Sequence, residues 1–163
     1  MPRRAVHGPG ESPGGPSGEP PPDLSQDLAA ALAAALVAEL AQRSGVCWVR
    51  HGEGTHPVWH VWCDGALCLV TGGDEQPLPD LADGDRVEVV MRSKDTGGRL
   101  LTWVGEVSVV RSGDEEWAAT TAALVAGRLN LRDPATAAED WARRSVVLRV
   151  VPRFDPDPVG PPA

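Results

Sequence analysis

Residues 46–71 read VCWVRHGEGTHPVWHVWCDGALCLVT, and this stretch decides the fold class. Its apolar, β-branched and aromatic residues come in short runs between turn residues, which predicts strands. The first strand is Val46–His51, closed by Gly52-Glu53-Gly54. The next two are Pro57–Cys63 and Ala66–Thr71. They form a hairpin, because the Asp64-Gly65 pair between them is strongly favoured in a type I′ turn.

The same patterns continue toward the C-terminus. They predict further strands at Arg86–Arg92, Arg99–Val110 and Val146–Val151, with a turn at Lys94–Gly98. Helices are predicted at Glu115–Leu129 and from Pro134 to Arg143 or Arg144, the second capped by Asp133. The chain is therefore mainly β with α. About six antiparallel strands with flanking helices predict a closed or partly closed barrel.

A helix precedes the first strand. Asp23 or Ser25 can cap its start, and Gly45 lies past its end. Four leucines recur every fourth residue and make one apolar stripe: Leu28, Leu32, Leu36 and Leu40. This spacing is typical of an amphipathic helix, so we expect the stripe to face the core.

The two ends differ in composition from the middle. Residues 1–22 and 155–163 consist largely of Gly, Pro, Ser and charged residues. Such segments bury too little apolar surface to offset the entropy of ordering them, so both are predicted to be disordered tails. The folded domain is predicted to span residues 23–154.

Charge and cysteine content exclude several classes of protein. The formal net charge of −8 argues against binding to nucleic acids or anionic membranes, since both need a basic face. Three cysteines cannot all pair, which favours reduced thiols in the cytoplasm. The apolar run Leu28–Ala41 is shorter than a membrane span, and no apolar segment directly follows Arg3 and Arg4 as in a signal peptide.

The order of these elements resembles the pyridoxamine 5'-phosphate oxidase-like split β-barrel family, whose members bind FMN or a deazaflavin. The resemblance covers nearly the whole chain between the tails. It depends on a leading helix followed by five stretches of sequence in a characteristic order: Gly45–Val49, Gly54–Trp62, Asp64–Thr71, Leu81–Arg92 and Gly98–Val110.

The resemblance implies a homodimer with FMN in grooves between two barrels, acting as an oxidoreductase on a small molecule. It places the ring against His56, Val58, Trp59 and His60, and the phosphate near the Thr71 hydroxyl and Gln76. The family has Lys or Arg near Gln76 and Pro77, whereas this chain has Asp74 and Glu75 just before them. Like charges beside a phosphate cost roughly 1 kcal/mol or more when partly desolvated.

Two other hypotheses stay open. One is a cofactor-free or haem-binding split-barrel dimer with a binding or regulatory role, in which His60 would be the axial ligand, as the resemblance to haem-binding relatives implies. The other is a structural interaction domain whose tails recruit a partner. No residue is assigned a catalytic role, and Glu106 is expected to face solvent.

Histidines and tryptophans cluster on the predicted strands. His56 and His60 lie on one face of a strand but about 13 Å apart, at ~3.3 Å per residue, so one zinc ion cannot bridge them. No metal site is predicted. Six tryptophans are expected to fill the core or a dimer interface. The alternative is that Trp59 or Trp103 stacks on a flat ring.

Overall fold

The structure, a computed structural model, describes residues 24–92 and 100–154. The predicted disordered tails and the Lys94–Gly98 turn lie outside these residues. Along the chain the elements are α1 (Leu24–Arg43), β1 (Val46–His51), β2 (Gly54–Trp59), β3 (Val61–Cys63), β4 (Ala66–Thr71), β5 (Arg86–Arg92), β6 (Leu100–Val110), α2 (Trp117–Gly127), α3 (Ala137–Arg144) and β7 (Val146–Arg153).

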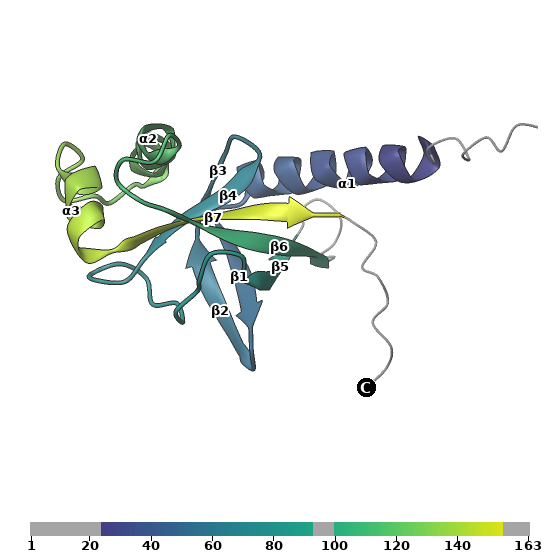
Figure 1. The fold of residues 1–163 in the computed structure, drawn as a ribbon, viewed down its shortest axis with the longest axis horizontal. Helices are drawn as coiled ribbons and strands as arrows, with labels where there is room; N and C mark the ends of the chain where they lie inside the picture. The colour runs from purple at the N-terminus through teal and green to yellow at the C-terminus, as the bar shows by residue number, and fades with distance from the viewer. Residues whose placement is uncertain (1–23, 93–99, 155–163) are drawn as a thin grey trace, which may run out of the picture.

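The seven strands form one sheet in the order β2-β1-β5-β6-β7-β4-β3, and neighbouring strands pair antiparallel throughout. Strands β2 and β3 are the two edges of this sheet, yet only His60 separates them along the chain. One residue cannot span a flat sheet, so the sheet must curl until its edges approach each other (Figure 1). The predicted mainly-β split barrel with flanking helices is confirmed.

The number of strands differs from the prediction because the expected strand Pro57–Cys63 is broken at His60. The backbone N–H of His60 donates to the Gly45 carbonyl at 3.2 Å. Its imidazole Nε2 donates to the Ala41 carbonyl at 3.0 Å. These contacts hold the chain against the end of α1 at the point where it passes from one sheet edge to the other.

Two hydrophobic clusters pack on opposite faces of the curled sheet, and β4 contributes to both. Leu67 and Leu69 belong to the barrel interior, with residues such as Val49, Val89 and Met91. The alternate residues of β4 lie beneath α2 and α3: Ala66, Cys68 and Val70. Strand β4 is therefore buried on both faces, and Figure 1 shows the two helices together at one end of the barrel.

The leucine stripe of α1 does not face the core, so that prediction is wrong. Leu28, Leu32 and Leu36 are 61, 64 and 47% exposed, and only Leu40 is partly buried. The helix contacts the barrel through Val37 and Ala41 instead. In Figure 1 its N-terminal part extends beyond the described strands of the barrel. With 20 residues and this composition, α1 also meets the length and apolarity of a membrane span, as many helices of other kinds do.

Local signals at the hairpin are confirmed, whereas the last helix starts later than predicted. Asp64 and Gly65 have φ values of 47° and 75°, as a type I′ turn requires. Helix α3 begins at Ala137 after Thr136. Asp133 does not cap it. Its carboxylate accepts from the Ala135 N–H at 3.0 Å in the turn that precedes the helix.

Candidate functional site

The loop after β4, residues 72–77, is the centre of the candidate site, because it touches elements from four parts of the chain. Gly72 and Gly73 both have positive φ, 81° and 61°, which turns the chain back on itself. The Ser145 hydroxyl donates to the Gly72 carbonyl at 3.1 Å. A Cβ on Gly73 would lie 2.6 Å from the Arg144 carbonyl oxygen, so glycine alone permits this close packing against the α3–β7 junction.

Gln76 joins the loop to edge strand β2 and to β4. Its side-chain oxygen accepts from the Trp59 N–H at 2.6 Å. Its amide nitrogen donates to the Trp59 carbonyl at 2.8 Å and to the Val70 carbonyl at 3.2 Å. The side chain therefore occupies the outward backbone groups of edge strand β2, as a neighbouring strand would. The Thr71 hydroxyl donates to the Gln76 carbonyl at 2.8 Å, so it too is engaged within the loop.

Glu75 points away from Thr71, toward the helices. One carboxylate oxygen accepts from the Arg128 guanidinium, and the other accepts from the Trp141 indole N–H at 2.9 Å. The Glu75 side chain is 13% exposed and that of Arg128 is 28% exposed. The Arg128 guanidinium also lies 5.7 Å from the centre of the Trp59 ring, within cation–π range.

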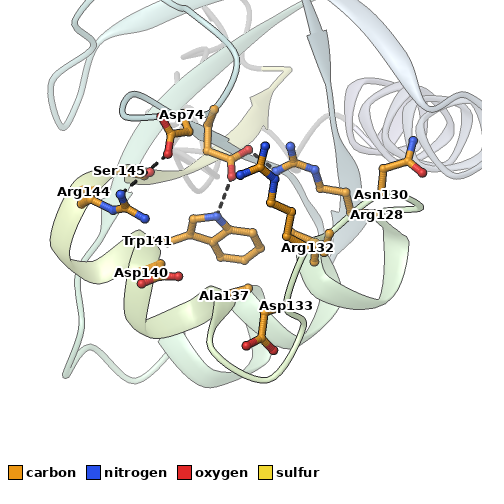
Figure 2. A pocket seen from close by; sticks show the side chains of 12 residues that line it. Asp74, Arg128, Asn130, Arg132, Asp133, Ala137, Asp140, Trp141, Arg144 and Ser145 are labelled. Atoms are coloured by element: carbon orange, nitrogen blue, oxygen red, sulfur yellow. Dashed lines mark hydrogen bonds and ion pairs between the residues drawn. The ribbon is translucent and has the colours of Figure 1, made fainter.

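Three hollows share Glu75 as part of their wall. The first, about 400 Å³, lies between the loop, α3 and the segment after α2, and is lined by arginines and carboxylates (Figure 2). Figure 2 shows Arg128 and Arg132 reaching into it from the segment after α2, above Trp141 of α3. The second, about 340 Å³, lies against Trp59, Gln76 and Arg128. The third, about 500 Å³, is lined by His56, Thr71 and the two glycines.

The six residues predicted for the site are only partly brought together. Trp59 and Gln76 line the second hollow, and His56 and Thr71 line the third. Val58 is 1% exposed inside the barrel and His60 is 2% exposed beside α1, so neither side chain reaches a hollow. Their assignment as cofactor contacts stays a prediction.

His60 is buried as a neutral side chain. Burial lowers the pKa of its imidazole, against the opposing effect of backbone hydrogen bonds at Ala41 and Val58. Its Nδ1 has no hydrogen-bond partner among the described residues. The ring would have to leave the Ala41 carbonyl or the interior before it could bind an iron.

The residues missed by sequence reasoning are the cations. Arg128, Arg132 and Arg144 follow or end helices, far along the chain from the loop after β4, and the resemblance directed attention to positions 76 and 77. The available signal was the spacing of Trp141 and Arg144 on one helix, which places both on the face that meets the loop.

The three cysteines show no sign of activation as nucleophiles, because burial raises the pKa of each thiol. All three are free, and burial raises the pKa of the Cys47 and Cys68 thiols to about 12. Over residues 24–92 and 100–154 no group of three or more His, Cys, Asp or Glu side chains could hold a metal ion. Trp103 is buried in the barrel core, so of the two tryptophans considered for stacking only Trp59 lines a site hollow.

Comparison with known proteins identifies the fold and goes no further. No protein-family model matches the chain, and no curated protein matches its sequence. The heme storage protein HutZ from Vibrio cholerae is similar in structure, with a TM-score of 0.53 and 12% identity over 73% of this chain and 89% of that one. A conserved hypothetical protein from Mycobacterium tuberculosis has a TM-score of 0.56 and 18% identity, over 73% of this chain and 79% of that one. An FAD binding protein from Mycobacterium smegmatis has a TM-score of 0.50 and 16% identity, over 72% of this chain and 88% of that one.

Proposed function

We propose that this chain is a cofactor-binding split-barrel protein that holds a flavin against Trp59. The observation that carries the proposal is the second hollow, where a partly exposed indole forms one wall and Arg128 lies over it. A flat aromatic wall with a few converging polar groups is the usual form of a small-molecule site. Two of the three similar structures are described as binding or storing a flavin or haem, which supports the same class of ligand.

The residues do not fit FMN in the arrangement that the resemblance implies. Thr71 is 7% exposed and its hydroxyl donates to the Gln76 carbonyl, so that hydroxyl is not free to bind a phosphate. Gln76 occupies the Trp59 backbone groups that would contact the ring, and Pro57, the next outward position of β2, has no N–H. FMN itself therefore stays one of several flavins to be tested, beside FAD and a deazaflavin.

The haem alternative is weaker on the same grounds. Its proposed axial ligand, His60, is 2% exposed and donates to the Ala41 carbonyl. An oxidoreductase activity would depend on the chemistry of the flavin ring. No described side chain is assigned a catalytic part in it.

The visible absorption spectrum of the purified protein is the first test, because flavin, deazaflavin and haem absorb differently. Titration with FMN, FAD, deazaflavin and haemin follows, read by absorbance and by flavin fluorescence. Trp59→Leu should weaken flavin binding by about 5-fold to 150-fold, since stacking on an indole contributes about 1–3 kcal/mol. Trp117→Leu is the matched control, because Trp117, the first residue of α2, is partly buried and lines none of the three hollows.

The flavin proposal is overturned if the purified protein is colourless and if titration with each flavin leaves the absorbance and the flavin fluorescence as they are without protein. Stoichiometric haem with no flavin would instead establish the alternative. Equal losses for the two tryptophan variants would mean that the ring does not lie on Trp59.

We also propose that two copies pair through α1. Its exposed leucines repeat every fourth residue, so in an antiparallel pair Leu24 would meet Leu36 and Leu28 would meet Leu32 of the partner. A two-fold interface needs such a self-complementary patch. Sedimentation equilibrium should show a dimer that Leu28→Gln with Leu32→Gln dissociates. Leu129→Gln, at a position 96% exposed away from α1, should leave it intact, and a wild-type monomer would refute the pairing.

A further inference from the structure

The carboxylate of Glu75 stands apart from the other acids around the 400 Å³ hollow. Asp74, next to it, is 91% exposed and lies 3.7 Å from Arg144. Asp133 accepts a hydrogen bond from the Ala135 N–H in its own turn, and Asp140 pairs with Arg143 of its own helix. Only Glu75, among the carboxylates that line this hollow, is mostly buried, with its side chain 13% exposed, and receives two donors from separate elements.

These two donors converge on one carboxylate group. Arg128 and the Trp141 indole N–H each donate to a different oxygen of the same carboxylate. A guanidinium and a neutral N–H that converge on two oxygens would suit the oxygens of a phosphate or a ligand carboxylate equally well. Arg132 and Arg144 line the same hollow and add positive charge around the point where the two donors meet.

The loop does not need the Glu75 side chain to keep its shape. Gln76 already fastens it to Trp59 and Val70, and Gly73 packs on the Arg144 carbonyl. The carboxylate can therefore rotate away about its own side-chain bonds while the backbone stays in place. The ion pair between Glu75 and Arg128 is partly buried, and such a pair is weak evidence for a purely structural role, because desolvation offsets much of the attraction.

We propose that Arg128 and Trp141 form an oxyanion site that Glu75 occupies in the free protein, and that the phosphate or carboxylate group of a small ligand displaces Glu75. The adjoining hollow of about 400 Å³ accommodates the rest of such a ligand. The exchange replaces one anion by another, so the two donors stay paired throughout. This inference stands without the flavin proposal, and different probes test the two.

Inorganic phosphate is the first probe, and acetate is the second. Binding is measured by calorimetry and by the NMR signal of the Trp141 indole N–H, which Trp141→Phe identifies. Glu75→Gln removes the competing charge and should raise phosphate affinity at least 10-fold. Asp74→Asn is the matched control, because it removes one negative charge from the same hollow without touching the two donors, and it should change affinity less than 3-fold.

In the Glu75→Gln background, adding Arg128→Gln should abolish the gain. The tighter of the two probes identifies which oxyanion the ligand carries. Equal gains for Glu75→Gln and Asp74→Asn would overturn the proposal, since general electrostatics would then account for both. No phosphate or acetate binding to Glu75→Gln at millimolar concentration would overturn it as well.

If Glu75→Gln fails to fold, the wild-type titration decides. A saturable shift of the Trp141 indole signal with phosphate or acetate supports displacement. No shift up to 100-fold molar excess over millimolar protein refutes it. A failed flavin titration leaves each of these outcomes unaffected.

Discussion

Gly73→Ala should destabilise the fold far more than Gly52→Ala, although the two glycines have nearly the same backbone conformation. Their φ values are 61° and 59°. A Cβ in this left-handed region costs roughly 1–2 kcal/mol, of which the stiffer unfolded chain returns about 0.4–1 kcal/mol. This backbone effect is common to both variants, so it should lower the free energy of unfolding of each by about 0.5–1 kcal/mol.

The surroundings of the two positions separate the variants. A Cβ at Gly52 would meet nothing within 4 Å, whereas at Gly73 it would lie 2.6 Å from the Arg144 carbonyl oxygen and 3.1 Å from the Ser145 Oγ. Both neighbours lie at the α3–β7 junction, and the carbonyl cannot rotate away as a flexible side chain could. Overpacking of this kind costs about 1–3 kcal/mol, and losing the Ser145 bond to the Gly72 carbonyl costs about 0.5–1.5 kcal/mol.

The assay is urea unfolding followed by circular dichroism. A difference of about 2 kcal/mol between the variants, at a slope of about 1–3 kcal/mol per molar, shifts the midpoint by about 1 M. The Trp141 indole signal should also move in Gly73→Ala, because the displaced loop carries Glu75. Equal midpoints for the two variants would refute the reasoning that the loop is held by backbone packing on the α3–β7 junction.

Three further predictions concern the contacts around the site. Burial lowers the pKa of His60, so the unfolded chain takes up a proton first as pH falls. The free energy of unfolding, taken relative to that of His60→Gln, should therefore be constant above pH 7.5. It should decrease below the unfolded pKa of about 6.5, by up to about 1.4 kcal/mol at pH 5.5. A difference that does not change with pH would contradict a buried neutral imidazole. Gln76→Ala should lower the free energy of unfolding in urea by about 1–3 kcal/mol and speed hydrogen exchange of the Trp59 amide, because three hydrogen bonds are lost. Slow exchange in the variant would mean that another group covers the edge of β2. Gly127→Ala should destabilise by about 1–3 kcal/mol in thermal unfolding despite the better helix propensity of alanine, because its Cβ would overlap the Val61 side chain; a stabilised variant would show that α2 can move off β3.

Much of the fold could be predicted from local patterns. The Asp64-Gly65 pair demands a left-handed turn whatever surrounds it, and the hairpin formed there. The strands Val46–His51, Ala66–Thr71 and Arg86–Arg92 have the predicted bounds. The break at His60 was missed because neither periodicity nor a Gly or Pro marks it. It arises from hydrogen bonds to the end of α1, which the neighbouring residues do not reveal.

The site was predicted less well, for a reason of the same kind. Trp59, Thr71 and Gln76 do meet around the loop after β4, because the curled sheet brings edge strand β2 close to the end of β4, where Gln76 bonds to both. From its neighbours in the sequence alone, the Glu75 carboxylate is predicted to repel a bound phosphate. The structure pairs it with Arg128, which is 53 positions further along the chain.

The sequence by itself determined the strands, the hairpin turn and the mainly-β barrel, because these follow from backbone preferences and from the alternation of side chains. Only the tertiary structure decided which side of α1 meets the barrel and which cations face the loop after β4. Helical spacing defines a stripe without saying what lies opposite it, and charge pairing depends on distance in space. In this chain the leucine stripe is exposed, against what its spacing predicts, and Glu75 is partly buried between Arg128 and Trp141.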